Sequence, residues 1–130
     1  MTVITFPGQG AQKPGLLAPW LEDETARDTL NRLSEVAEID LITHGTESDA
    51  ATIKDTAVAQ PLIVAAGIIS WDALVRAGAV LDQVAVAGHS VGEITAAYAA
   101  GVFDADTAIR FVTRLSLIHI SEPTRQEAIS

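Results

Sequence analysis

The sequence predicts an α/β protein in which helices flank a parallel sheet. Two short runs rich in β-branched and small apolar residues, 2–6 and 84–88, have the composition of buried strands. Segments with helical periodicity lie between these runs and after the second one. Strands that alternate with helices are typical of βαβ units, whose strands are parallel.

The totals fit one soluble globular domain or part of a larger one. The chain has 130 residues, of which 48% are hydrophobic and 19% are charged. It contains no cysteine, which excludes disulfides and thiolate metal sites. The three histidines, His44, His89 and His119, show no metal-ligand spacing, so we expect no metal.

Charge and hydropathy exclude two classes of partner. The net charge is −9, whereas nucleic-acid binding needs a basic footprint. The N-terminus lacks the basic flank of a signal peptide, and the most apolar run, 62–69, is too short to span a bilayer. We therefore expect a cytoplasmic protein that binds neither nucleic acid nor membrane.

The first predicted strand, 2–6, ends at Pro7 and is followed by the loop Gly8-Gln9-Gly10-Ala11-Gln12. Its glycines free the backbone to take positive φ angles, and it follows a carboxyl strand end, where open α/β sheets keep their ligands. The spacing lacks the third glycine and basic residue of a phosphate loop. From the residues alone, an ordinary turn and a ligand-contacting loop both remain open.

The next segments predict short and medium helices. Leu16, Leu17 and Trp20 indicate a short helix. Asp23 is a predicted N-cap for a longer helix, whose apolar stripe is Leu30, Leu33, Val36 and Ala37. Residues 39–55 are polar and mixed, which indicates short helical turns and loops.

A long apolar helix is predicted within 57–77. Proline is tolerated in the first turn of a helix, so Pro61 moves the expected start to Ala59 or Gln60. Gly78 is the expected C-terminal glycine, and the apolar run 62–69 indicates burial on most sides. Farther along, Gly101 ends another helix and Asp104 caps the one that follows, 105–114.

The second predicted strand leads into Gly88-His89-Ser90-Val91-Gly92, after which helical periodicity begins. A glycine two residues on either side of a serine fits a strained strand-to-helix elbow, which leaves no room for a Cβ at those positions. The elbow would expose the Ser90 hydroxyl as a nucleophile. It would also aim the Val91 N–H at the space where an oxyanion could form. The alternative is an ordinary tight turn.

With both loops considered, the chain resembles the malonyl-CoA:acyl carrier protein transacylase family of fatty acid and polyketide synthesis. Three motifs carry the resemblance: Phe6-Pro7-Gly8-Gln9-Gly10-Ala11-Gln12, Gln60-Pro61, and Gly88-His89-Ser90-Val91-Gly92-Glu93. The resemblance implies an α/β-hydrolase-like parallel sheet with flanking helices. It also implies a small ferredoxin-like subdomain later in the chain, which this truncated sequence lacks.

The resemblance also assigns roles to residues. Ser90 would be the acylated nucleophile, the backbone amides of Gln9 and Val91 the oxyanion hole, and Gln60 a substrate-binding residue. His89 adjoins the nucleophile and would point away from it, so we expect a structural, hydrogen-bonding role for it.

The implied reaction transfers a malonyl group from malonyl-CoA to the phosphopantetheine thiol of an acyl carrier protein, through an acyl-serine, in fatty acid biosynthesis. No cofactor is implied beyond these substrates. The alternative is a serine esterase or thioesterase with the same elbow, in which water accepts the acyl group.

The chain departs from the family pattern near its end. The family's catalytic histidine lies far downstream of the elbow, beyond this chain. Its carboxylate-binding arginine should stand at 115, where this chain has Leu115, and Arg114 is rotated by about 100° on a helix. We therefore expect a chain of this length to be inactive and to leave its long apolar helix uncovered.

From Leu115 onward the sequence has no expected family counterpart. The stretch SLIHISEPTR is similar to a peptide obtained when sequencing-adapter DNA is conceptually translated. We predict that 1–114 is the N-terminal part of the acyltransferase large subdomain and that 115–130 is a non-native tail, in which His119 has no function. A genuine lineage-specific tail is the alternative.

Overall fold

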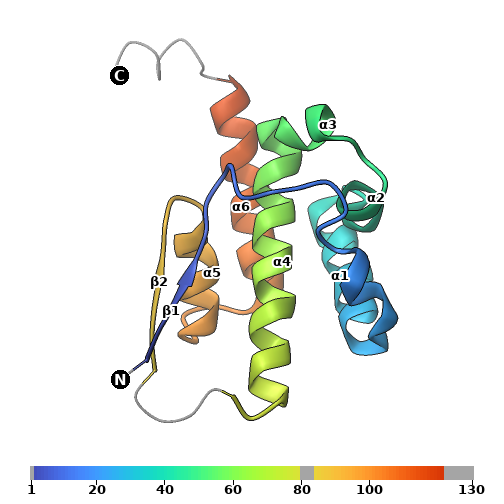
Figure 1. Cartoon of the computed structure of the whole chain (residues 1–130). Coiled ribbons are helices and arrows are strands. Elements are labelled where there is room, and N and C mark those ends of the chain that lie inside the picture. The colour runs from blue at the N-terminus through green and yellow to red at the C-terminus, as the bar shows by residue number, and fades with distance from the viewer. Residues whose placement is uncertain (1, 80–83, 122–130) are drawn as a thin grey trace.

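A long central helix, α4 (Thr56–Arg76), separates a small sheet from a group of shorter helices in the computed structural model, which describes residues 2–79 and 84–121 (Figure 1). The sheet side holds β1 (Thr2–Phe6), β2 (Val84–Gly88) and α5 (Gly92–Ala99). The other side holds η1 (Ala18–Glu22), α1 (Glu24–Ala37) and α2 (Leu41–Thr46). Two more helices, α3 (Ala50–Lys54) and α6 (Ala105–Ser121), pack against α4. The predicted α/β class is confirmed.

The two strands form a parallel pair, as the sequence predicts. The register runs from Thr2 opposite Val84 to Phe6 opposite Gly88. The expectation that both strands are buried is wrong, because in β1 Phe6 alone is buried and β2 is at most half-buried. In the described residues each strand is an edge strand, so much of both remains exposed. The predicted connection 80–83 lies outside the described residues.

The run 62–69 of α4 is largely buried, which confirms its predicted place in the core. Leu62, Val64 and Ile68 have no exposed surface, and α4 packs against α1, α2, α3, α5 and α6. The expectation that a chain of this length leaves the helix uncovered is therefore wrong. By length and composition α4 could cross a membrane, and half of its apolar window is buried inside the structure.

The start of α4 differs from the prediction. The helix begins at Thr56 rather than at Ala59 or Gln60, and Pro61 lies inside it. Pro61 cannot donate the backbone hydrogen bond that this position would make. The start is set instead by Asp55, whose carboxylate accepts a 3.0 Å hydrogen bond from the Ala57 N–H. The additional turn carries Thr56 toward the loop after β1.

Other helix ends follow the predicted chemistry. Asp23 and Asp104 accept N-cap hydrogen bonds from the backbone of Thr25 and Thr107. The glycines at 78 and 101 have φ angles of +72° and +83°, which suit the C-terminal glycine position. The short helix expected at 16–20 is a 3-10 helix that begins two residues later, at Ala18.

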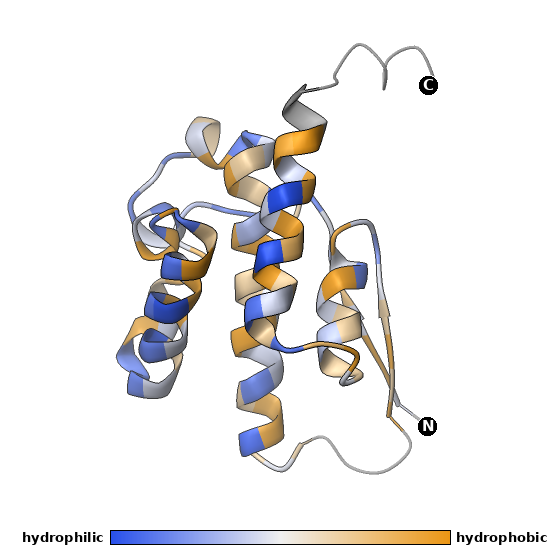
Figure 2. Ribbon diagram, turned by 180° about the vertical axis from the view of Figure 1, so that it is seen from behind, coloured by the Kyte–Doolittle hydropathy of each residue, from blue (hydrophilic) through white to orange (hydrophobic). Residues whose placement is uncertain are grey.

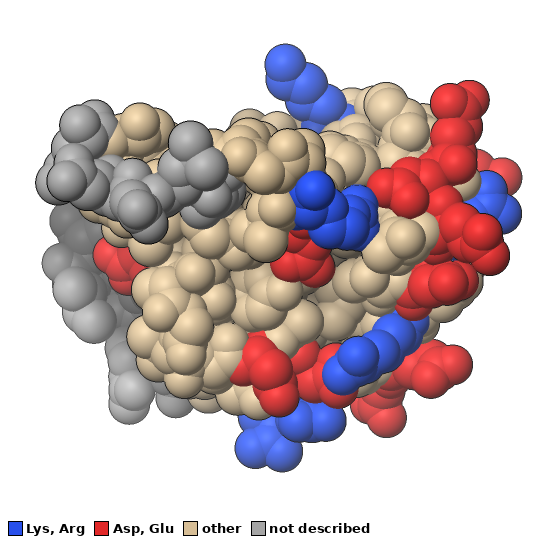
Figure 3. All heavy atoms as spheres, turned by 90° about the horizontal axis from the view of Figure 1, so that it is seen from below, with Lys and Arg blue, Asp and Glu red and all other residues tan. Residues whose placement is uncertain are grey.

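Polar side chains join the helices at the surface. Arg32 of α1 donates a 2.8 Å hydrogen bond to Asp106 of α6, and Tyr98 of α5 donates a 2.6 Å bond to Asp72 of α4. Burial and the Asp72 carboxylate raise the pKa of Tyr98, so this phenol stays a donor. Seen from below, acidic side chains gather on the side of α1 and η1 (Figure 3).

The helix α6 is continuous across the predicted domain boundary at 114. Its ribbon alternates between hydrophilic and hydrophobic segments, as in an amphipathic helix (Figure 2). The described part of this helix runs to Ser121. The assignment of 115–130 to a non-native tail stays a prediction.

We expect Ile68→Ala to lower the free energy of unfolding by about 2–5 kcal/mol, because it opens a cavity in the core around α4. Val75→Ala, in the same helix but 50% exposed, should change it by less than about 1 kcal/mol. Urea unfolding followed by circular dichroism measures both. Equal effects of the two substitutions would contradict the packing described for α4.

Candidate active site

Ser90 lies on the turn that joins β2 to α5. Its φ angle is +58°, in the left-handed region that non-glycine residues seldom occupy, and its side chain is exposed. Such a conformation costs about 1–3 kcal/mol and persists only where the surroundings impose it. The turn that the sequence predicts for a nucleophile is thus present, with the serine at its tip.

Both glycines that flank Ser90 are required by sterics. A Cβ on Gly88 would overlap the backbone of Gly92 and Glu93. A Cβ on Gly92 would overlap the carbonyl of Phe6 and lie 2.8 Å from the Pro7 oxygen. Strand and helix therefore approach too closely for side chains, as predicted.

The loop after β1 lies directly against this turn. The His89 N–H donates a 3.1 Å hydrogen bond to the Phe6 carbonyl, which extends the pairing of the strands by one residue. A Cβ on Gly8 would lie 2.7 Å from the Ser90 Cβ. The sequence left the role of this loop open, and the structure places it against the turn that carries Ser90.

Two backbone N–H groups on the segments that meet at Ser90 are available to donate to a ligand. Within residues 2–79 and 84–121, neither Gln9 nor Val91 donates its N–H to a protein acceptor. Val91 precedes the first turn of α5, where the partial positive charge of a helix N-terminus favours an anion. The following N–H groups, from Gly92 to Ile94, are already paired within the turn.

Gln60 contacts the same loop through its side chain. Its carboxamide is buried and donates to the Gln9 side-chain oxygen at 3.3 Å. The Gln9 amide nitrogen donates in turn to the Thr56 hydroxyl at 3.1 Å. The Ser116 hydroxyl lies 2.9 Å from the Gln60 oxygen. Sequence reasoning missed both Thr56 and Ser116, since no motif contains them.

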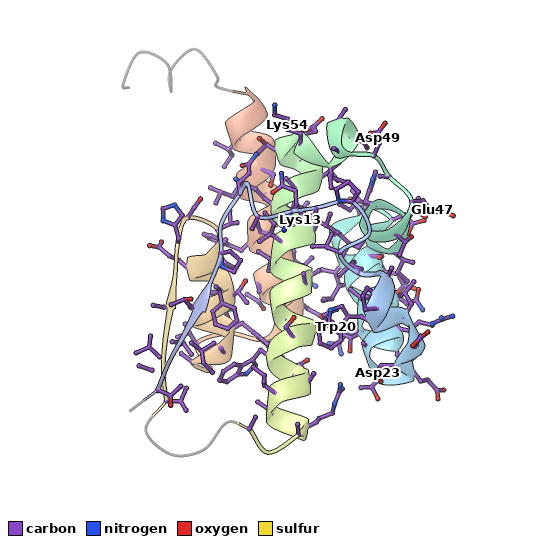
Figure 4. All side chains as sticks on the ribbon, in the orientation of Figure 1. Lys13, Trp20, Asp23, Glu47, Asp49 and Lys54 are labelled. Atoms are coloured by element: carbon purple, nitrogen blue, oxygen red, sulfur yellow. The ribbon has the colours of Figure 1, made fainter. Side chains whose placement is uncertain are left out.

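The loop also borders a surface cavity of about 380 Å³, lined by Gln9, Gly10, Gln12, Ala50, Ile53 and Lys54. In Figure 4, Lys54 lies near the start of α4, and Lys13 lies on the loop where it crosses that helix. The cavity therefore opens next to Gln9 but does not include Ser90.

In the described part of the chain, no hydrogen bond joins the other candidate side chains to Ser90. The hydrogen bonds found there for His89 are made by its backbone, and the structural role expected of this residue stays a prediction. His44 is on α2, 2.9 Å from Ser48. Arg114 is exposed, and Leu115 packs against the core. The His119 side chain is not among those described.

Comparison with known proteins identifies relatives of this chain. The family model described as acyl transferase domain matches residues 3–129. A malonyl CoA-acyl carrier protein transacylase of Mycobacterium tuberculosis is 41% identical over an alignment of 134 positions, which covers 99% of this chain and 44% of the relative. The chain thus spans less than half of the curated relative that it matches.

Solved structures share the fold. The crystal structure of MCAT from Mycobacterium tuberculosis has a TM-score of 0.84 at 45% identity, over 87% of this chain and 38% of that one. A type II polyketide synthase acyl carrier protein in complex with its malonyl-transacylase matches with a TM-score of 0.81 at 31% identity, over 88% and 37%.

Because the backbone of Ser90 is left-handed, we expect glycine to be more stable than alanine at this position, the reverse of the usual order in helices. Ser90→Gly should be more stable than Ser90→Ala by about 0.5–1 kcal/mol, because glycine adopts positive φ without strain. The same order is expected for Glu38→Gly and Glu38→Ala, since Glu38 has a φ of +59°. Ala97→Gly, in the interior of α5, should instead destabilise by about 0.5–1 kcal/mol. Urea unfolding of the set measures these differences, and a Ser90→Gly variant less stable than Ser90→Ala would disprove the strain.

Proposed function

The chain belongs to the acyl transferase domain family, and on that premise we propose that it supplies the nucleophile of an acyl carrier protein S-malonyltransferase of fatty acid biosynthesis. The observation that carries the proposal is Ser90, held on a strained turn with two free N–H groups beside it. Relatives that bear the transacylase name support it. Because the chain spans 44% of such a relative, the rest of the catalytic machinery would come from a longer protein.

The proposed reaction has two transfers at Ser90. Its Oγ attacks the thioester carbonyl of malonyl-CoA, a C–O bond forms, and the C–S bond breaks to release coenzyme A, whose sulfur takes the serine proton through a base. The phosphopantetheine thiol of the carrier protein then attacks the acyl-serine. Its proton returns to the serine oxygen through the same base, and the malonyl thioester leaves.

Each transfer passes through a tetrahedral intermediate with a negatively charged oxygen. We assign its stabilisation to the backbone N–H groups of Gln9 and Val91, which lie on the two segments that meet at Ser90. The helix N-terminus behind Val91 adds favourable potential for that charge. Gln60 lines the site from α4 by holding the Gln9 side chain.

The base is assigned to a histidine farther along the longer protein, in the Ser then His order of this fold type. A chain ending at 130 would therefore lack its base, and loss of a triad member costs several orders of magnitude in rate. It would also lack the carboxylate-binding arginine, whose expected position holds Leu115. We propose that the 130-residue chain alone is inactive.

The partners follow from the same assignment. A structural relative is a malonyl-transacylase bound to its acyl carrier protein, which supports a carrier protein and malonyl-CoA as the two substrates here. Serine acyl transfer needs no metal or cofactor of its own, and we expect the reaction to occur in the cytoplasm. We also infer that the parallel sheet continues in an α/β-hydrolase-like manner in the longer protein, followed by a ferredoxin-like subdomain.

A serine esterase or thioesterase is the competing function, because the same elbow serves hydrolases. The Gly-Gln-Gly loop against Ser90 and the names of the relatives favour the transferase.

For the full-length protein we expect transfer of the malonyl group to a carrier-protein thiol to be at least about tenfold faster than hydrolysis. The reason is that an acceptor held in the right orientation reacts faster with the acyl-serine than one that is not. The measurement follows free malonate and malonyl carrier protein by mass spectrometry. In the Ser90→Ala variant both products should fall to background, since no acyl-serine can form.

Release of free malonate at one rate, with and without carrier protein, would replace the transferase with the esterase. Activity of the 130-residue chain within about tenfold of the full-length protein, a loss of about 1.4 kcal/mol, would mean that the base lies in this chain.

A further inference from the structure

Both ends of the Gln9 side chain are held by α4. Its amide nitrogen lies 3.1 Å from the Thr56 hydroxyl, and its oxygen lies 3.3 Å from the Gln60 nitrogen. Thr56 is the first residue of α4, and Gln60 follows one turn later on the same side of the helix. The Gln9 carboxamide is thus clamped between two successive turns, although Gln9 itself is largely exposed.

The clamp acts on a segment that is otherwise weakly fixed. Between Gly8 and Gln12, the described hydrogen bonds within the loop are Gly10 N–H to the Gln12 side chain and Ala11 N–H to the Gly8 carbonyl. Gly10 has a φ of +110°, and nothing lies within 4 Å of where its Cβ would be, so side-chain packing does not hold this position. The Gln9 side chain therefore connects the loop to the rigid core helix.

We propose that Thr56 is a positioning residue for acyl transfer, which orients the Gln9 backbone N–H beside Ser90 by holding the Gln9 side chain. The inference rests on the proposed function. Gly8, the neighbour of Gln9, is packed against the Ser90 Cβ, so a shift of Gln9 changes the space above the nucleophile. An oxyanion donor is effective only at the right distance, and a small displacement lowers the rate.

The direction of the hydrogen bonds does not alter the argument. The Ser116 hydroxyl has one hydrogen and lies near two acceptors, the Gln60 oxygen at 2.9 Å and the Val112 carbonyl at 2.8 Å. If the hydrogen goes to Val112, both glutamine amides reverse, and the Thr56 hydroxyl donates instead of accepting. Removing the Thr56 hydroxyl breaks the clamp in either direction.

The matched variants are Thr56→Val, which keeps the shape but removes the hydroxyl, and Thr56→Ser, which keeps the hydroxyl. Thr25→Val, in the first turn of α1, controls for placing valine near a helix start. In the 130-residue chain, NMR relaxation of the backbone nitrogens should give order parameters of about 0.85 for Gln9 and Gly10. These values should fall toward about 0.6 in Thr56→Val but not in the other two variants.

In the full-length protein, Thr56→Val should lower kcat about fivefold to tenfold, the effect of losing one positioning hydrogen bond. The KM for malonyl-CoA should change less than about twofold, because in this proposal Thr56 acts through the Gln9 side chain and not on the substrate. Thr56→Ser should restore kcat to within about twofold, and Thr25→Val should leave it unchanged. A smaller folded fraction would also lower the apparent kcat at unchanged KM, so kcat is expressed per folded protein, measured by circular dichroism. Rescue by Thr56→Ser and the local loss of order at Gln9 then distinguish the positioning role.

Unchanged order parameters in Thr56→Val would overturn the clamp, whatever the effect of the substitution on kcat. Lowered order parameters with an unchanged kcat would overturn the positioning role. If wild-type full-length protein forms no acyl-enzyme while the order parameters respond as expected, the proposed function fails and the clamp stands.

Discussion

The close approach of the end of β1 to the turn after β2 is the contact on which the site depends. Backbone meets backbone there, because Gly92 faces the Phe6 carbonyl and Gly8 faces His89 and Ser90. A single methyl group at either glycine would separate the two segments. The hydrogen bond from the His89 N–H to the Phe6 carbonyl then fixes how the two segments are aligned with each other. Ser90 receives its positive φ from this arrangement, and the strain at this residue is sustained by the strands and helices around it.

The helix α4 connects this contact to the core. Its middle turns are buried against the other helices, while its first turn, begun by the Asp55 cap, reaches the loop after β1. One helix thereby supports the core and contacts the loop that lies against Ser90. The same dual use explains why Gln60, a polar residue, is buried there: its carboxamide has partners on both sides.

The sequence was informative where the constraint is local. The glycines of the elbow, the caps Asp23 and Asp104, and the C-terminal glycines were predicted, because each depends on the conformation of a few adjacent residues. Sequence reasoning was wrong about the start of α4, where the rule for Pro61 was applied and the cap at Asp55 was not recognised. It overestimated strand burial, since composition does not reveal how many neighbours a strand has. Thr56 and Ser116 were missed because their contacts join segments 47 and 56 residues apart.

The most direct test of the account is the identity of the acylated residue. Full-length protein incubated briefly with malonyl-CoA, quenched in acid and digested, should carry one malonyl group on the peptide containing Gly88 to Gly92, with fragmentation locating it on Ser90. The modification should disappear when carrier protein is added before the quench. A malonyl group on any other residue, or equal labelling of a Ser90→Ala protein, would contradict the assignment of this turn as the nucleophile.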